Sequence, residues 1–380
     1  MDYDITLFKA VVNEKAIAAI ARVLGSGYLG QGKEVESAEQ ELFPFTQNKN
    51  ILLTNSCTSA LHLAYYLSGV GPGAEVIVAP MTCLATVSPI VQLGGTIVWA
   101  DIDPISGLIS TKSVEEKITS RTRAIVAVDW AGFPCDWRGL SVLGPRVIID
   151  AAHSIGSTVR GETAGQIADF VCYSFQAIKQ LTCGDGGGIV CLRAADYDRA
   201  RKLRWYGLNR DEEADGFRCN QDALEIGFKF NGNDIMAAML RAQITSLEWS
   251  LRRSRYISSV YGDRLKGLED FCFAPPRIDT ISSPWMFPAI VADRDDFHGY
   301  MAGKGIQVSP VHRRLDTMSA FAPFTDNLPG VSFFADHQIN IPTGSWMTNN
   351  QLDKVVNVIR GYRGEAVHVP VEQEWGVWKT

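Results

Sequence analysis

Two stretches near the middle of the chain decide the fold. They are residues 147–153, VIIDAAH, and residues 170–191, FVCYSFQAIKQLTCGDGGGIVC. Their apolar runs are short and continuous rather than alternating, which is typical of strands that are buried on both faces of a sheet. Polar residues follow these runs directly: Asp150 ends the first, and Ser174 and Lys179 follow the second. The pattern predicts buried strands whose polar side chains gather where the strands end.

The same pattern of short apolar runs is present in the preceding part of the chain. Further apolar runs lie at 51–53, 76–79, 96–99 and 124–128. Amphipathic stretches at 58–68 and 85–93 separate the first three of these runs. Alternation of strand and helix predicts an α/β fold, with a mainly parallel seven-stranded sheet.

The pattern of apolar residues changes after residue 192. Residues 194–206 and 234–265 have a helical pattern, Pro275-Pro276 marks a break, and a last helix is expected at 352–360. We therefore predict two domains: residues 1–245 form a large α/β domain, and residues 246–380 form a smaller α+β domain.

Composition excludes several classes of protein. The 380 residues are 46% hydrophobic and 21% charged, as in soluble globular chains. With 36 basic and 42 acidic residues the formal charge is −6, which disfavours nonspecific binding of nucleic acid. No run approaches the roughly 20 apolar residues of a membrane helix, and the acidic start, Met1 to Ile5, is unlike a signal peptide. We expect a cytoplasmic protein without a membrane or nucleic-acid partner.

Eight cysteines are spread along the chain and none forms a Cys-x-x-Cys pair, so a zinc ribbon is unsupported and no metal is expected. Most lie in apolar stretches, where free cysteine behaves as a small hydrophobe. We interpret them as reduced, buried thiols: Cys57, Cys83, Cys135, Cys172, Cys183, Cys191, Cys219 and Cys272.

Lys179 and Asp150 are the two residues that most strongly indicate a catalytic function. A lysine in the crevice at the strand ends can have a lowered pKa, and its neutral amine can form a Schiff base. Pyridoxal phosphate requires such a lysine for its aldehyde and an acid for its pyridine nitrogen. Taken singly, Asp150 could cap a turn and Lys179 could lie at the surface; together, on two strand ends, they favour the cofactor site.

A phosphate site is the second local signal. Ser56 and Thr58 lie between the strand at 51–53 and the following helix, where backbone N–H groups and hydroxyls bind anions. An ordinary helix cap would have the same sequence. Neither a Walker loop nor an early Gly-x-Gly-x-x-Gly is present, which disfavours a nucleotide-dependent oxidoreductase of the Rossmann type.

Taken together, these stretches resemble the fold-type I, pyridoxal-phosphate-dependent sugar aminotransferases of the DegT/DnrJ/EryC1/StrS family. The matching segments run nearly from end to end, in order and at the family's spacing. They are residues 26–32, 54–63, 71–78, 101–104, 149–154, 173–187 and 227–235.

The resemblance implies a role for each matching residue. Lys179 forms the Schiff base and moves the proton, Asp150 pairs with the pyridine nitrogen, and His153 lies near the ring. The cofactor phosphate is bound by Ser174, Ser56, Cys57 and Thr58, with Lys229 contributed in trans by the second subunit of a homodimer whose active sites are shared. L-glutamate is the implied amino donor, and a keto-sugar on a nucleoside diphosphate is the implied acceptor.

Several positions depart from the family's pattern. Cys83 falls where an aromatic side chain usually packs on the cofactor, Cys57 where glycine is common, and Gln176 where many members have histidine. Lys229 stands where asparagine is frequent.

Candidates for the acceptor site are Tyr28 and Leu29 near the N-terminus, and His312, Arg313 and Arg314 in the small domain. Two arginines could bind a diphosphate or simply face solvent. An enzyme of this fold that acts on a free keto-cyclitol stays open as an alternative. A non-catalytic regulator is a further alternative, which the presence of Lys179, Asp150 and the phosphate loop disfavours. A sugar dehydratase is disfavoured, because histidine replaces the Schiff-base lysine in that class.

Overall fold

A seven-stranded sheet forms the centre of the protein, which we describe from a computed structural model covering residues 3–210 and 220–369. The strand order is β1-β8-β7-β5-β4-β2-β3. The strands are β1 Ile51–Thr54, β2 Glu75–Val78, β3 Thr96–Trp99, β4 Thr122–Val128, β5 Arg146–Asp150, β7 Phe170–Ser174 and β8 Gly187–Cys191. All seven apolar runs are therefore strands, and the predicted α/β class is confirmed.

Only β8 runs against its neighbours within this sheet. It pairs antiparallel with both β1 and β7, whereas the β7-β5-β4-β2-β3 part is parallel. The carboxyl ends of β1, β5 and β7 consequently share one edge of the sheet. Two small pairs, β10 Phe287–Ile290 with β11 Gln338–Ile341 and β6 Thr158–Val159 with β9 Thr280–Ile281, lie outside it.

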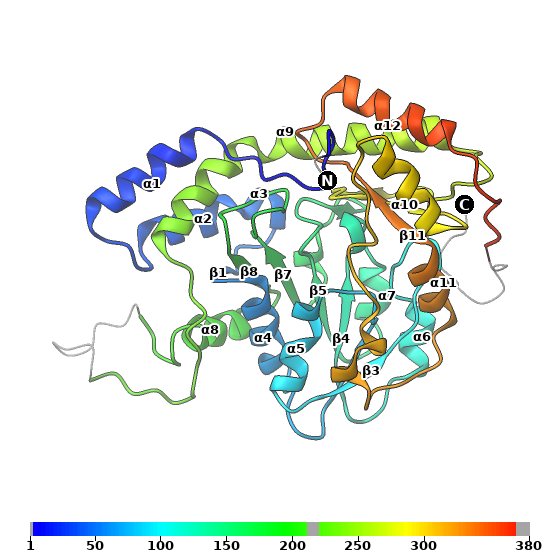
Figure 1. Ribbon diagram of the computed structural model, residues 1–380. Coiled ribbons are helices and arrows are strands. Elements are labelled where there is room, and N and C mark those ends of the chain that lie inside the picture. The colour runs from blue at the N-terminus through cyan, green and yellow to red at the C-terminus, as the bar shows by residue number, and fades with distance from the viewer. Residues whose placement is uncertain (1–2, 211–219, 370–380) are drawn as a thin grey trace.

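Helices cover the sheet and link it to the second half of the chain. Helix α4 packs against β1, β5, β7 and β8, and the long α9 runs across the top of the view from α1 and α2 to α12 (Figure 1). The helices are α1 Lys15–Ser26, α2 Lys33–Glu41, α3 Phe43–Thr46, α4 Cys57–Leu67, α5 Leu84–Gln92, α6 Thr111–Glu116, α7 Trp137–Ser141, α8 Ala194–Leu203, α9 Asp234–Leu265, α10 Arg294–Gly303, α11 Pro329–His337 and α12 Asn349–Gly361. Within the described residues, no helix is both long and apolar enough to span a membrane.

The hydrophobic core consists of two clusters that meet along α9. Leu247 and Leu251 belong to the sheet's cluster, whereas Ile257 and Tyr261 belong to the cluster around β10 and β11. The predicted boundary at 245/246 falls inside this continuous helix. Ile5, near the N-terminus, joins the second cluster, so the start of the chain packs with the residues around β10 and β11.

The described cysteines are free thiols, and most are buried as expected. Cys57, Cys135, Cys172, Cys183 and Cys191 are buried and Cys272 is partly buried. Cys83 is exposed, because it stands in the loop before α5 rather than in the core. Cys219 lies outside the described residues.

Candidate active site

Asp150 lies at the centre of the site, at the carboxyl end of β5. It is 5% exposed, and burial raises the pKa of its carboxyl group. Its Oδ2 accepts a hydrogen bond from Thr86 Oγ1 at 2.8 Å, and its Oδ1 accepts one from the Ala152 amide at 3.1 Å. Both contacts oppose the effect of burial on the pKa, since they stabilise the charged form. The carboxylate is thus held in one orientation.

Thr86, whose hydroxyl donates to Asp150, is a candidate site residue that sequence reasoning missed. It lies on α5, is completely buried, and is also hydrogen-bonded to Thr82 Oγ1 at 2.7 Å. The Thr86 carbonyl accepts a hydrogen bond from Tyr65. A hydroxyl in the first turn of a predicted helix, three positions after Cys83, was the available signal, but the pairing with Asp150 spans 64 positions.

Lys179 lies in the loop between β7 and β8, with its amine over an aromatic ring. Its Nζ is 3.6 Å from the ring centroid of Trp285. Burial lowers the pKa of Lys179 to about 8, while nearby Asp150 partly opposes that shift. An amine with this pKa is neutral in an appreciable fraction of molecules near neutral pH, as a nucleophile requires.

Trp285 builds a stack that positions Lys179 and His153. Its ring stacks on Phe8 at 4.4 Å on one side and on His153 at 4.0 Å. Its indole N–H donates to the Ile178 carbonyl at 2.8 Å, next to the lysine. Sequence reasoning missed Trp285 because it lies more than 100 positions from the residues it contacts.

His153 is buried and has an unused polar atom. Its Nδ1 has no hydrogen-bond partner within the described residues. Burial, followed by the nearby charge of Lys179, lowers the pKa of His153, so the imidazole is neutral. A buried nitrogen without a partner points to a bound group that supplies one.

His312 comes to the same place from the small domain. Its ring centroid is 6.4 Å from that of His153 and 5.5 Å from that of Trp130. Burial lowers the pKa of His312 to about 4, so this imidazole is neutral as well. The structure thus brings one predicted acceptor-site residue beside the predicted cofactor site.

The expected phosphate loop connects β1 to α4. Ser56 caps the helix, its Oγ accepting from the Ser59 amide at 3.1 Å, so the first free amides of α4 point out of the helix start. A Cβ at Gly187 would lie 2.4 Å from the Cys57 nitrogen, so only glycine lets β8 approach so closely. Ser174, at the end of β7, is partly exposed at the same edge of the sheet. These groups can hold a phosphate.

The two cysteines of the site differ in environment. Cys57 is buried with its Sγ 4.0 Å from Asp150 Oδ1, and burial raises the pKa of this thiol well above its ordinary value. Cys83 is exposed and gives no side-chain cap to α5. Burial therefore favours the protonated thiol of Cys57 beside the carboxylate.

Lys229 is directed toward an aromatic ring of its own chain. Its Nζ lies 3.5 Å from the ring centroid of Trp205 and 2.8 Å from Asn231 Oδ1. The segment that holds it is tied to the loop before α4, since Asn55 donates to the Lys229 carbonyl. Binding of a second subunit's phosphate by Lys229 stays a prediction.

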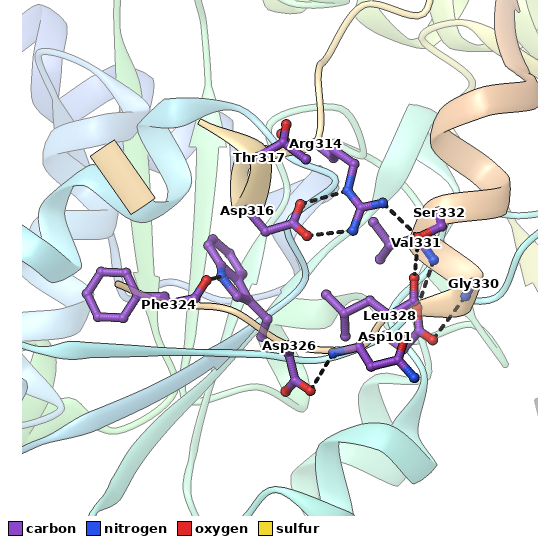
Figure 2. Close-up of polar contacts among 12 residues, drawn as sticks. Asp101, Arg314, Asp316, Thr317, Phe324, Asp326, Leu328, Gly330, Val331 and Ser332 are labelled. Carbon is purple, nitrogen blue, oxygen red and sulfur yellow. Dashed lines mark hydrogen bonds and ion pairs between the residues drawn. The ribbon is translucent and has the colours of Figure 1, made fainter. Parts of the chain in front are cut away.

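The two arginines after His312 differ sharply. The guanidinium of Arg314 forms a two-pronged ion pair with Asp316, at 2.9 and 2.5 Å, and a third bond to Ser332 Oγ (Figure 2). Arg313 is exposed and makes only longer bonds to Thr317. Because Arg314 already has strong partners, Arg313 is the better candidate for a diphosphate.

Tyr28 and Leu29 lie on the segment before α2 and are exposed. Asp234, at the start of α9, holds this segment: its Oδ1 accepts from the Gly32 amide at 2.7 Å, and its own amide donates to the Gly30 carbonyl. No contact joins either residue to the lysine site within the described chain.

The arrangement as a whole fits pyridoxal phosphate. A lysine of lowered pKa, a buried carboxylate, a neutral histidine with an unpaired nitrogen, and a helix start for the phosphate meet at one sheet edge. These are the groups that the cofactor's aldehyde, ring nitrogen, ring substituents and phosphate require.

Comparisons with known proteins agree with this chemistry. The sequence model of the DegT/DnrJ/EryC1/StrS aminotransferase family matches residues 11–360. The crystal structure of AtS13 from Actinomadura melliaura is similar, at 34% identity and a TM-score of 0.92, covering 96% of this chain and all of that one. The sugar aminotransferase CalS13 from Micromonospora echinospora is 32% identical, with a TM-score of 0.90 over 94% and 99% of the two chains.

A third similar structure is named with its cofactor. It is the PLP-form of Spr1654, a putative sugar aminotransferase from Streptococcus pneumoniae, at 25% identity and a TM-score of 0.86, covering 94% of this chain and 98% of that one. The matches extend over nearly the whole chain, including every segment that carries the resemblance. The chain belongs to the DegT/DnrJ/EryC1/StrS family of sugar aminotransferases, and it is a pyridoxal-phosphate-dependent aminotransferase.

Proposed function

We propose that the protein transfers an amino group from L-glutamate to a keto-sugar carried on a nucleoside diphosphate. The pairing of Lys179 with Asp150 at one sheet edge carries the proposal, because amino transfer needs both a Schiff-base lysine and an acid for the ring nitrogen. We place the reaction in the cytoplasm, in line with the free thiols of the described chain.

The proposed roles of the residues follow from their environments. When bound, pyridoxal phosphate supplies the electron sink that makes the donor's Cα–H acidic. The Lys179 amine would hold the cofactor, and as a free amine it would accept and return the proton of the donor's Cα. Asp150 keeps the ring nitrogen protonated, and Thr86 keeps Asp150 in place. The Trp285 face gives the released ammonium a favourable position, since a cation over an indole is stabilised.

The acceptor site is proposed from the groups around this lysine. His312 is one of them, since its ring centroid lies 6.4 Å from that of His153. Arg313 offers a charge for the diphosphate, and we propose Lys229 as a contact to the partner's cofactor phosphate. Tyr28 and Leu29 are exposed in the single chain. We propose that they contribute to the acceptor site where a second subunit covers them.

A homodimer is supported by exposed apolar side chains next to Lys229. Leu224 and Ile226 are 92% and 81% exposed, immediately before the segment 227–235. Large apolar groups that face water on one segment are typical of an interface. We propose that a second copy of this chain covers them and that the active sites are shared.

The function is tested by steady-state kinetics with L-glutamate and a panel of nucleoside-diphosphate keto-sugars, with mass spectrometry of the products. Ping-pong transfer predicts parallel lines in double-reciprocal plots of the initial rate, and an aminated nucleotide sugar as the product. Intersecting lines, or amination of a free keto-cyclitol in preference to every nucleotide-linked sugar, would contradict the proposal.

The lowered pKa of Lys179 gives a pH prediction. The amine is neutral above about pH 8, so capture of pyridoxal phosphate by cofactor-free enzyme should quicken about tenfold per pH unit below 8 and then level off. Stopped-flow absorbance measures this rate. A rate that keeps rising toward pH 10.5, the ordinary value of a lysine, would show that Lys179 is not desolvated.

Thr86→Val is expected to weaken cofactor binding about 10- to 100-fold, because it removes a hydrogen bond to a charged, buried carboxylate at nearly constant volume. Equilibrium dialysis measures the dissociation constant. Ser88→Ala, on the same helix with a hydroxyl that bonds only the Leu84 carbonyl, is the control and should bind normally. Equal affinities for both variants would remove Thr86 from the site.

A further inference from the structure

Strand β11, which reads Gln-Ile-Asn-Ile, carries two amide side chains and is completely buried. Ile339 and Ile341 belong to the hydrophobic cluster around β10 and β11. Because side chains alternate along a strand, Gln338 and Asn340 lie on its other face. Burial of an amide costs free energy, and Asn340 Oδ1 has no hydrogen-bond partner within the described residues. Polar groups at such a cost indicate a role beyond packing.

Both amides bind the loop that carries His312. Gln338 Nε2 donates to the Pro310 carbonyl at 2.7 Å. Asn340 Nδ2 donates to the Ser309 carbonyl at 3.1 Å and to Gln338 Oε1 at 3.0 Å, so the second amide also orients the first. The Asn340 backbone amide donates to the same Ser309 carbonyl at 2.9 Å. The two side chains thus fix the backbone two and three positions before His312.

The chain makes a tight turn between these anchors and His312. The His312 amide donates to the Pro310 carbonyl at 2.7 Å, and Val311 between them has a φ of +65°. A three-residue turn of this kind is rare and strained, above all for a β-branched residue. Such a conformation persists only where its surroundings fix it. Here the Gln338 amide shares the Pro310 carbonyl, the Val311 amide donates to Ser309 Oγ at 3.1 Å, and the Val311 side chain packs against the sheet's core.

The chain after His312 is anchored to the same part of the fold. Arg314 donates to Ser332 Oγ on α11 at 2.7 Å (Figure 2), and α11 ends directly before β11. The Leu315 amide donates to the Pro80 carbonyl at 2.9 Å, which ties the segment to the loop after β2. The imidazole therefore stands on a short segment that is held on both sides.

Two buried polar atoms near His312 have no hydrogen-bond partner within residues 3–210 and 220–369. They are Trp130 Nε1 and His153 Nδ1. The ring centroid of His312 lies 5.5 Å from that of Trp130 and 6.4 Å from that of His153. Unpaired buried groups of this kind point to a polar group that binds from outside. A ligand that binds them lies within reach of the His312 imidazole, so the position of this ring affects how the ligand is held.

We propose that Gln338 and Asn340 are positioning residues for the acceptor: they fix the strained turn at Val311 and so hold the His312 imidazole where the keto-sugar binds. The inference rests on the proposed function, which gives His312 its place in the acceptor site. Neither amide is hydrogen-bonded to Lys179 within the described chain. Loss of an amide should therefore slow the half-reaction with the acceptor and spare the half-reaction with glutamate.

Labelling of histidines with diethyl pyrocarbonate, followed by peptide mass spectrometry of the full-length holoenzyme, tests the positioning itself. Gln338→Met keeps the length of the side chain but removes the donor, so His312 should react about fivefold faster, the effect of one lost hydrogen bond. The exposed His298 serves as the internal reference. Unchanged reactivity of His312 would overturn the proposal.

Two further variants support this measurement. Asn48→Leu is the matched control, because it removes an amide that donates to the Gly165 carbonyl, also at 2.7 Å, and it should leave the labelling of His312 normal. Ser309→Ala removes only the hydroxyl that accepts from the Val311 amide, so it decides the question if Gln338→Met does not fold. It should raise the reactivity of His312 as well, and unchanged reactivity would again contradict the proposal.

Single-turnover kinetics of the two half-reactions test what the position serves. Gln338→Met should slow the half-reaction with the nucleotide-linked keto-sugar about fivefold and change the half-reaction with glutamate less than about twofold. In a His312→Ala background the same substitution should have little further effect, because residues that act through one another are not additive. Equal slowing of both halves, or an undiminished effect without His312, would overturn the proposal.

Failure of the proposed function gives a different result. In that case the unchanged enzyme aminates none of the nucleotide-linked keto-sugars, whereas failure of the positioning inference leaves amination intact and the labelling of His312 unaltered in Gln338→Met. The labelling needs no acceptor, so the two failures are distinguished.

Discussion

Lys179→Ala is expected to lower the rate of amino transfer by at least about 10³-fold, because the substitution removes the proposed Schiff-base nucleophile, which is also the proposed base for the Cα proton. The amine lies 3.6 Å from the Trp285 ring and its pKa is about 8, so it is positioned and partly neutral before cofactor binds. Single-turnover kinetics with glutamate measure the loss. The visible absorbance of the cofactor–lysine bond should vanish with it.

The control for this substitution is Lys112→Ala, which removes an exposed lysine on α6. It should keep normal rates and a normal spectrum. Since Lys179 packs on Trp285, thermal unfolding of both variants separates lost chemistry from lost folding. A Lys179→Ala enzyme that folds and still turns over within tenfold of the original rate would contradict the assignment.

Asp150→Asn is expected to lower the rate on the order of 10²–10³-fold, the range seen when one electrostatic stabiliser of a reaction is removed. The amide has the same shape but carries no charge, so it could not perform the role proposed for Asp150, which is to keep the ring nitrogen protonated. Cofactor affinity should fall as well, by a smaller factor. Rapid-mixing spectroscopy of the glutamate half-reaction measures the rate, and dialysis measures the affinity.

Asp129→Asn is the matched control, because Asp129 is also a buried carboxylate at the carboxyl end of a strand. It directly follows β4, the strand that pairs with β5. It accepts bonds from the Cys135 amide and the Trp137 indole rather than facing the lysine, and burial raises its pKa to about 6. This change should affect thermal stability more than the half-reaction. If both variants slow the half-reaction equally, Asp150 has no special role.

The sheet and the positions of its strands along the chain were predictable because each buried strand is a short apolar run bounded by polar residues. The run at 147–149 becomes β5 and the run at 170–173 becomes β7, with Asp150 and Ser174 at their ends. The antiparallel direction of β8 was not predictable, since a continuous apolar run has the same composition in either direction. The end of α8 at Leu203 was also missed; Tyr206 and Gly207 have positive φ and turn the chain there.

The sequence could suggest residues of the candidate site only where they are close in sequence to a strand end. Thr86 and Trp285 escaped because their roles depend on contacts with Asp150 and Lys179 across long separations. Arg314 shows the opposite difficulty, since sequence reveals a positive charge but not that Asp316 and Ser332 already bind it (Figure 2). Side-chain pairing is set by packing, which periodicity does not encode.

The central claim is that Lys179 bears the cofactor. Reduction of the holoenzyme with borohydride fixes pyridoxal phosphate on the lysine to which it is attached, and peptide mass spectrometry then locates it. We predict a single pyridoxyl group on Lys179, lost when excess glutamate is added before reduction. Modification of any other lysine, with Lys179 unmodified, would contradict the account.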